Sequence, residues 1–264
     1  MPEHILPIPP RWEKDLEYGW VTFKRGNDEL RGYFAKPKGG TNLPGIVMAP
    51  ENLGIIEHRQ DVTRRLAKAG YACITVDPYS RIGGQSPRDF KDATERRIKA
   101  SLATPDEQFV PDLQAAADWL AARDDVDGNR IGAIGYCSGG GSTYGWVLGE
   151  SHNIKCTVIF YGAPKSRGNS RPDGKDLDRT KNGAKLQMPI LIHHGALDKN
   201  LMANYPAQEA ELKKNKIKYE GRIYPNSVHG FFNDATPERY NKVTAEEAWT
   251  RTIAWFNQHT RDQA

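Results

Sequence analysis

Short runs of β-forming residues alternate with longer helical patterns along most of the chain, and this alternation restricts the fold more than any other feature. Strands that alternate with helices form a mostly parallel sheet covered by helices. The predicted strands span residues 18–25, 30–36, 45–49, 71–76, 130–135, 155–161, 189–193 and 218–224. The predicted helices span residues 57–69, 110–123, 206–215 and 244–258, and a further one at 89–102 lies within a long connection.

The first two predicted strands differ from the others. They are amphipathic and are separated by Gly26-Asn27-Asp28, which predicts an antiparallel hairpin at one edge of the sheet. The later strands are nearly continuous apolar runs such as Ile131-Gly132-Ala133-Ile134, which is typical of strands buried on both faces. We therefore predict an α/β protein with an eight-stranded, mostly parallel sheet flanked by helices.

Composition and charge exclude several classes of protein. The 264 residues contain no linker-like region, which predicts a single domain over 1–264 with a short Pro-rich arm at about 1–16. No apolar stretch approaches the ~20 residues that cross a bilayer, and residues 1–5 lack the basic start of a signal peptide. A net charge of +4 is too small for a nucleic-acid footprint. We expect a cytoplasmic protein with neither membrane nor nucleic acid as a partner. Whether the arm packs on a second copy, forming a homodimer, stays open.

The segment Gly135-Tyr136-Cys137-Ser138-Gly139 is the most informative motif. It follows the fifth predicted strand and has the Gly-x-Cys-x-Gly spacing of a nucleophile elbow, with sulfur in place of the usual serine oxygen. The glycines are needed because larger side chains would clash beside an atom displayed on so sharp a turn. The turn also places the thiol at a helix N-terminus, which favours the thiolate, and offers the Ser138 amide to an oxyanion. The pattern predicts Cys137 as a nucleophile.

The other two cysteines have a simpler interpretation. Cys73, Cys137 and Cys156 match neither a disulfide framework nor a zinc-ligand spacing, and we predict no metal and no other cofactor. Cys73 and Cys156 lie in predicted strands, where a cysteine is usually a small buried residue. Neither is placed to resolve an oxidised Cys137, which argues against a thiol redox sensor.

A nucleophilic thiol needs a base, and the base needs a residue that orients it. Asp198 follows the seventh predicted strand and His229 follows the eighth, at the edge where open parallel sheets place their sites. We predict that His229 exchanges a proton with Cys137 and that Asp198 fixes the imidazole. Asp77 and His194 compete for these roles, although Asp77 fits a turn and His194 fits packing at a strand end.

These residues carry a resemblance to a known family. From about residue 30 to residue 256 the chain resembles the dienelactone hydrolases, which are α/β-hydrolases with a cysteine nucleophile. The resemblance rests on the elbow and on two further motifs, Glu51-Asn52-Leu53-Gly54-Ile55 and His229-Gly230-Phe231. It implies an α/β-hydrolase fold and a triad of Cys137, Asp198 and His229.

The resemblance also implies further roles around the nucleophile. Glu51 would contact the resting thiol and release it when substrate binds, and the amides of Asn52 and Ser138 would hold the oxyanion. Because a neighbouring carboxylate opposes thiolate formation, we expect a mostly protonated thiol at rest. The alternative for Glu51 is a strand-end carboxylate that caps a loop.

The resemblance also implies which residues bind the substrate. Arg81 falls where the family has an arginine that binds a substrate carboxylate, a task suited to the planar guanidinium, and its alternative is a surface charge. Asn233 stands where the family pattern His-Ser-Phe-Ala-Arg has a second such arginine. Tyr136 and Phe231 near the triad predict a more apolar pocket.

The leading hypothesis is a cofactor-independent hydrolase of lactones or small carboxylic esters that works through a Cys-His-Asp triad and a thioester acyl-enzyme. One alternative is a general carboxylesterase with an apolar acyl pocket. Another is a non-catalytic, hydrolase-like binding or scaffold protein, although a decayed site usually loses a member of its triad. The natural substrate, and whether residues 163–188 cover the pocket, stay open.

Overall fold

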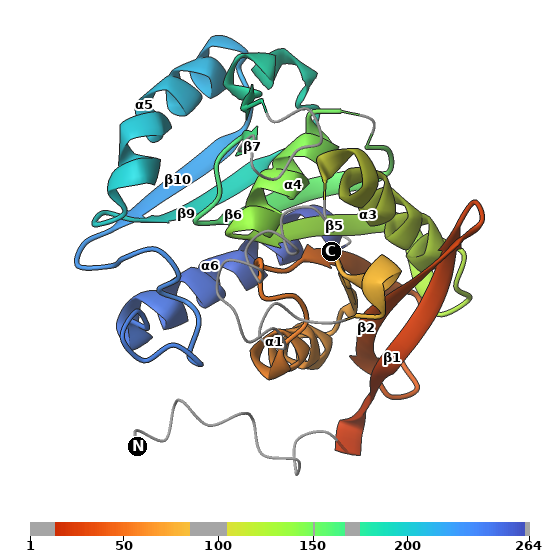
Figure 1. Ribbon diagram of the computed structural model, residues 1–264. Helices are drawn as coiled ribbons and strands as arrows, with labels where there is room; N and C mark the ends of the chain where they lie inside the picture. The colour runs from red at the N-terminus through yellow and green to blue at the C-terminus, as the bar shows by residue number, and fades with distance from the viewer. Residues whose placement is uncertain (1–13, 85–104, 150, 167–174, 262–264) are drawn as a thin grey trace.

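The computed structural model describes residues 14–84, 105–149, 151–166 and 175–261. At its centre lies an eight-stranded sheet with the strand order β1-β2-β4-β3-β5-β6-β9-β10 (Figure 1). Its strands are β1 Leu16–Arg25, β2 Asp28–Pro37, β3 Leu43–Ala49, β4 Ala72–Val76, β5 Val126–Tyr136, β6 Ile154–Phe160, β9 Ile190–Gly195 and β10 Tyr219–Tyr224. β2 pairs antiparallel with β1 and β4, and every other pairing in the sheet is parallel. The predicted sheet and its edge hairpin are confirmed.

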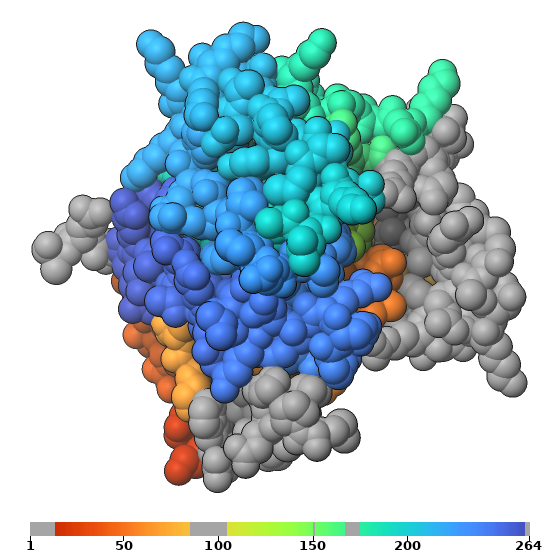
Figure 2. Space-filling view, turned by 90° about the vertical axis from the view of Figure 1, so that its left-hand side faces the viewer, coloured from red at the N-terminus to blue at the C-terminus, as the bar shows by residue number. Residues whose placement is uncertain are grey.

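Helices cover both faces of this sheet (Figure 1). They are α1 Glu57–Lys68, α3 Asp106–Ala121, α4 Ser138–Val147, α5 Lys199–Lys214 and α6 Lys242–Thr260, with short 3₁₀ turns η3 Ser80–Ile82 and η6 Thr180–Lys185. One apolar cluster joins α3, α4 and α5 to the sheet. A second cluster joins α1 and α6 to the opposite face. Figure 2 shows the side of the molecule on which α5 and α6 lie.

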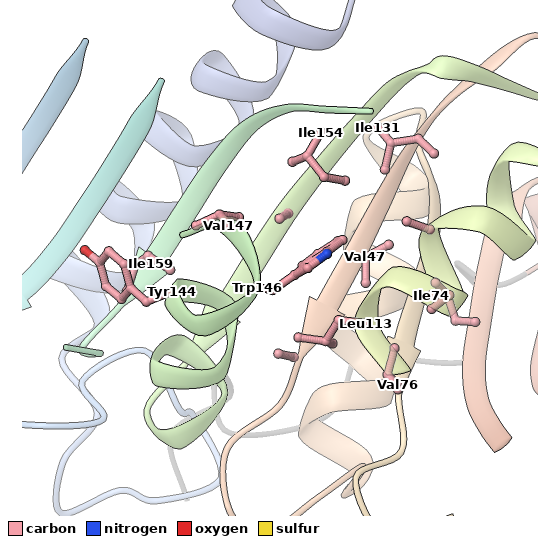
Figure 3. Close-up of a cluster of buried hydrophobic side chains, with 14 of the residues drawn as sticks. Val47, Ile74, Val76, Leu113, Ile131, Tyr144, Trp146, Val147, Ile154 and Ile159 are labelled. Atoms are coloured by element: carbon pink, nitrogen blue, oxygen red, sulfur yellow. The ribbon is translucent and has the colours of Figure 1, made fainter. Parts of the chain in front are cut away.

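The central strands supply side chains to both clusters, as expected of strands buried on both faces. Along β3, Ile46 and Met48 belong to the α1–α6 cluster, whereas Val47 and Ala49 belong to the cluster under α3 and α4. Figure 3 shows the cluster under α3 and α4, where Trp146 of α4 lies among aliphatic side chains of the sheet and α3. The core thus fixes each strand in register and holds the carboxyl ends of the strands in place.

Two helix starts differ from the sequence prediction. α5 begins at Lys199 rather than at Pro206, because the Asp198 carboxylate caps it by accepting a hydrogen bond of 3.2 Å from the Leu201 amide. α6 begins at Lys242, and its cap is Asn241, whose side chain accepts from the Thr244 amide. The predicted capping box that starts at Thr244 is therefore wrong.

The long connections are only partly described. The predicted helix at 89–102 and most of the N-terminal arm lie outside the described residues. The connection 163–188 contributes a small two-stranded sheet of β7 Lys165–Ser166 and β8 Leu177–Asp178, followed by η6. Within the described ranges, no helix combines the length and the apolar character that crossing a bilayer requires.

Candidate active site

Four polar side chains follow strands of the parallel part of the sheet. Glu51 comes after β3, Cys137 after β5, Asp198 after β9 and His229 after β10. These strands run in parallel, so their carboxyl ends meet at one edge of the sheet. The fold therefore collects side chains that are far apart in sequence at a single edge.

Cys137 occupies a sharp turn between β5 and α4. Its backbone has φ 55° and ψ −119°, a conformation that residues other than glycine rarely adopt. The turn leaves no room for side chains next to it, because a Cβ on Gly139 would lie 2.2 Å from the carbonyl oxygen of Pro50. A Cβ on Gly135 would lie 2.6 Å from the carbonyl oxygen of Gly139. Strain of this kind is typical of functional positions, and here it presents the thiol at the start of a helix.

The thiol, the imidazole and the carboxylate are in contact. Nε2 of His229 lies 3.1 Å from Sγ of Cys137, and Nδ1 of the same ring lies 2.6 Å from Oδ2 of Asp198. The other oxygen of Asp198 accepts the amide of Leu201, so the helix cap and the imidazole fix the carboxylate together. Both imidazole nitrogens are thus engaged in the order that a nucleophile, a base and an orienting acid require.

The electrostatics of the site follow from these contacts. Burial lowers the pKa of His229, but hydrogen bonds to Asp198 and Cys137 outweigh burial and raise the pKa to about 10. Burial raises the pKa of the Asp198 carboxyl, but the hydrogen bonds from His229 and from the Leu201 amide bring it below its usual value. The carboxylate is therefore charged at neutral pH and favours the imidazolium form of His229.

Glu51 does not have the partner that the resemblance implied. Its carboxylate is bound by Nε of Arg59, and its Oε1 accepts a hydrogen bond of 2.8 Å from the side-chain amide of Asn233. Burial raises the pKa of Glu51, but the charge and hydrogen bond of Arg59 outweigh burial and bring it below the usual value. In this structure the thiol is paired with His229, and the carboxylate of Glu51 is turned to other groups.

Arg59 is the residue at this edge that sequence reasoning missed. It lies on α1, is fully buried, and stacks its guanidinium on the Tyr136 ring at 3.6 Å from the centroid. The available signal was the run His58-Arg59 on a helix whose next apolar position, Val62, faces the core. Charged residues on a core-facing helix turn indicate buried partners.

The two predicted oxyanion donors lie on two segments that approach each other at Gly139 and Pro50. Ser138 is the first residue of α4, and Asn52 lies in a turn closed by a hydrogen bond of 2.9 Å from the Gly54 amide to the Glu51 carbonyl. The Tyr79 hydroxyl donates to the Asn52 carbonyl and fixes that peptide. The close approach of Gly139 to Pro50 brings both segments together. The roles of the two amides remain predictions.

Arg81 does not face the triad as a free cation. Its Nη1 donates to Asp112 at 2.7 Å, its Nε donates to Asp28 at 3.0 Å, and its Nη2 donates to both carboxylates. Arg25 adds a further ion pair with Asp112 at 3.0 Å. All three guanidinium nitrogens are thus engaged in tying η3 to the hairpin and to α3. The geometry therefore gives the predicted substrate-binding role no support.

Tyr136 and Phe231 also differ from the prediction. Both side chains are fully buried in the cluster under α1 and α6, so neither presents surface to a substrate in this structure. Tyr136 is the last residue of β5, and its ring stacks on Phe160 and under Arg59. Tyr136 and Phe231 are therefore core side chains in this structure and do not line an open pocket.

A cleft of about 310 Å³ adjoins the start of α5, next to Asp198. It is lined by Ala163, Lys165, Ser166, Asp176, Leu177, Asp178, Asn200, Leu201 and Asn204. Lys165 is held there by Asp178 at 3.1 Å and by Asn204 at 2.6 Å. In the described part of the chain, no group of three or more histidine, cysteine or acidic side chains is arranged to hold a metal ion.

Comparisons with known proteins agree with this architecture. The sequence profile of the Dienelactone hydrolase family matches residues 30–260. A protein of Escherichia coli O157:H7 named as a carboxymethylenebutenolidase is 31% identical over 249 residues, covering 91% of this chain and 87% of the relative. A Bradyrhizobium protein named as a 2-oxo-3-(5-oxofuran-2-ylidene)propanoate lactonase is 29% identical over 248 residues, covering 91% and 94%. Among solved structures, a dienelactone hydrolase of Klebsiella pneumoniae matches with a TM-score of 0.80 and 28% identity, covering 92% of this chain and 99% of that one.

Proposed function

Because this chain belongs to the dienelactone hydrolase family, we propose that it hydrolyses lactones or small carboxylic esters with Cys137 as the nucleophile. The observation that carries the proposal is the chain of contacts from Sγ of Cys137 through the His229 ring to Asp198, at 3.1 Å and 2.6 Å. The names of the relatives favour lactones, since both a carboxymethylenebutenolidase and a lactonase act on a cyclic ester.

The first half of the reaction acylates the enzyme. The Cys137 thiolate, with its proton on Nε2 of His229, attacks the ester carbonyl carbon and forms the new C–S bond. The carbonyl oxygen becomes an oxyanion, which the amides of Asn52 and Ser138 hold. The C–O bond then breaks, and the leaving oxygen takes the proton from His229. A lactone ring opens in this step, and its leaving oxygen stays on the acyl group.

The second half releases the product. His229, now neutral, accepts a proton from water, and the water oxygen attacks the thioester carbonyl. The C–S bond breaks as the tetrahedral state collapses, and Cys137 leaves as the thiolate. His229 keeps the proton taken from water, which restores the starting thiolate–imidazolium pair, and the carboxylic acid product loses its proton to solvent. Asp198 holds the ring in one tautomer throughout, because Nδ1 must donate to the carboxylate while Nε2 exchanges protons.

The test measures hydrolysis of p-nitrophenyl acetate and of a small panel of unsaturated lactones by the wild-type protein and by Cys137→Ala. We expect hydrolysis by the wild type, loss of activity in the variant, and loss of activity when iodoacetamide alkylates Cys137. Cys156→Ala is the matched control, because Cys156 is a buried strand residue on the same sheet. Full activity of Cys137→Ala would overturn the proposal.

A further inference from the structure

We propose that Arg59 is a positioning residue that holds the Glu51 carboxylate away from Cys137, so that the thiol pairs with His229 before any substrate arrives. The inference rests on the proposed function, since it takes Cys137 as the nucleophile. It replaces the expectation of a thiol kept protonated at rest by Glu51. The site would then be active without a substrate-driven rearrangement of that carboxylate.

The first argument is that both oxygens of Glu51 are engaged. Nε of Arg59 donates to Oε2, and the side-chain amide of Asn233 donates to Oε1 at 2.8 Å. Asn233 lies on the segment that follows His229, and Arg59 lies on α1, so two separate elements grip the same carboxylate. Glu51 would have to give up at least one of these partners to reach the thiol.

The second argument is the place of Arg59 between the two halves of the site. Its guanidinium contacts Glu51, which directly precedes Asn52, and stacks on Tyr136, which directly precedes Cys137. The centroid of the Tyr161 ring lies 6.2 Å from that of the Tyr136 ring and 5.2 Å from that of the His229 ring. Arg59 therefore links the turn after β3 to the turn after β5.

The third argument concerns what Arg59 does not do. Its side chain is fully buried, so a substrate has no access to it in this structure. In the described part of the chain, Nη1 and Nη2 have no hydrogen-bond partner, and neither do the hydroxyls of Tyr136 and Tyr161. A buried ion pair with unused donors is a weak source of stability, because apolar side chains of similar volume serve as well. Its presence beside a nucleophile therefore indicates a role through Glu51.

The charges around Glu51 determine what the loss of Arg59 would do. His58, hydrogen-bonded to Asp234 at 2.6 Å, is the other titratable side chain of α1 that interacts with Glu51. Burial and the charge of Arg59 lower the pKa of His58 below its usual value, and Asp234 and Glu51 oppose this shift. Without Arg59, Glu51 would keep the neutral side-chain amide of Asn233 and a backbone hydrogen bond. Its carboxylate would then be free to accept a hydrogen bond from the protonated thiol in competition with His229, and its charge would disfavour the thiolate.

The experiment compares the rate at which iodoacetamide alkylates Cys137 between pH 5 and pH 10 in four proteins, identified by peptide mass spectrometry. They are the wild type, Arg59→Met, the double variant Glu51→Gln with Arg59→Met, and the control Arg64→Met. Arg64 is a second buried arginine of α1, and it pairs with Glu57 and Tyr33 instead. Hydrolysis of p-nitrophenyl acetate and thermal unfolding are measured on the same samples.

We expect Arg59→Met to be alkylated about tenfold more slowly at pH 7, with the profile moved up by about one pH unit. The double variant and Arg64→Met should react within about threefold of the wild type. A purely structural role for Arg59 would not be rescued by removing the Glu51 charge. An unchanged rate in Arg59→Met, or a double variant as slow as the single one, would overturn the proposal.

Two outcomes separate this proposal from the proposed function. If wild-type Cys137 is inert to alkylation and the protein hydrolyses nothing, the proposed function fails. If the wild type reacts and hydrolyses but Arg59→Met behaves identically, only the role of Arg59 fails. If Arg59→Met does not fold, the double variant decides alone, because it removes both buried charges. An alkylation rate of Cys137 within about threefold of the wild-type rate then supports the proposal. A rate about tenfold slower than that of the wild type overturns it.

Discussion

Arg59 and Arg81 are both bound to carboxylates, yet their surroundings differ in every other respect. Arg59 is fully buried, and among the residues that the structure describes it binds a single carboxylate and has two nitrogens without a hydrogen-bond partner. The Arg81 side chain is 23% exposed, and all of its nitrogens are shared between Asp28 and Asp112. Arg81 completes a satisfied ion-pair network at the hairpin, whereas Arg59 is an incompletely satisfied cation beside a nucleophile.

The difference teaches that an arginine's chain position is a poor guide to its role. Arg81 stands where the family resemblance implies a substrate-binding cation, but its partners make it a tie between η3, the hairpin and α3. Arg59 lies on a helix that carries no motif, and its partners place it against the turns on either side of the thiol. A cation whose N–H groups all have hydrogen-bond partners stabilises the fold. A buried cation with unpaired N–H groups beside a nucleophile costs stability, and its presence indicates a functional role.

The largest effect should come from the triad. His229→Asn removes the proton carrier, so kcat/KM on p-nitrophenyl acetate should fall about 10³-fold or more. Arg81→Met, in the same assay, should stay within about threefold of wild type. A steady-state comparison of the two variants settles the contrast: equal losses would mean that the hairpin network belongs to the active site after all.

The next effect tests the electrostatics of the imidazole. Asp198→Asn removes the leading contribution that raises the pKa of His229, so that pKa should fall from about 10. Less imidazolium should then accompany the thiolate at pH 7, and kcat should drop about 10²-fold. NMR titration of the His229 ring gives the pKa directly. A ring that still titrates near its wild-type pH would show that Asp198 is not its partner in solution.

A smaller effect separates stability from catalysis at the hairpin. After Arg81→Met, Arg25 is the cation among the described residues that still pairs with the buried Asp112, at 3.0 Å, and with Asp28, at 3.5 Å. We expect a loss of about 1–3 kcal/mol in the free energy of unfolding. The ratio of kcat/KM for carboxylate-bearing and neutral esters should not change. A selective loss of the carboxylate-bearing esters would return Arg81 to the substrate site.

The smallest effect contrasts two histidines with opposite shifts. Burial lowers the pKa of His194 to about 4, so between about pH 6.5 and pH 4 the unfolded chain binds a proton that the native state does not. Stability should therefore fall as pH drops through that window. His229, with its raised pKa, stabilises the fold below about pH 6.5 and loses that contribution only as pH rises toward 10.

Urea unfolding of wild type and His194→Phe at pH 7 and pH 5.5 measures this contribution. Between these two pH values, His194 should account for about 1 kcal/mol of the wild-type decrease in the free energy of unfolding. The variant should lack this contribution. Replacement of the exposed His152 by Gln is the control for removing an imidazole from the surface. A variant with the full wild-type slope would contradict the shift at His194.

Local patterns predicted the parts of the molecule that local physics determines. The apolar runs of β3, β4, β5, β6 and β9 predicted buried parallel strands. The small residues around Cys137 predicted the elbow, because a sharp turn between a strand and a helix leaves no room for larger side chains. Strand order then placed Asp198 and His229 at the same edge as the thiol. Chain order and strand-end position were enough to bring these three residues together.

The partners of charged groups depended on distant segments and escaped prediction. Asn233 reaches Glu51 across 182 residues, and Arg81 reaches Asp28 across 53. No spacing rule connects such pairs, because they depend on how helices and loops pack over the finished sheet. The same packing turned the ring of Tyr136 into the core, away from the pocket that its place beside Cys137 had suggested.

The most direct test of the account is to trap the acyl-enzyme. The protein is mixed with excess p-nitrophenyl acetate, quenched in acid within the first turnovers, digested and analysed by tandem mass spectrometry. The account predicts one acetyl group, attached as a thioester to Cys137 and released by hydroxylamine at neutral pH. An acetyl group on Ser138 or on another residue that forms at the rate of turnover, with Cys137 unmodified, would contradict it.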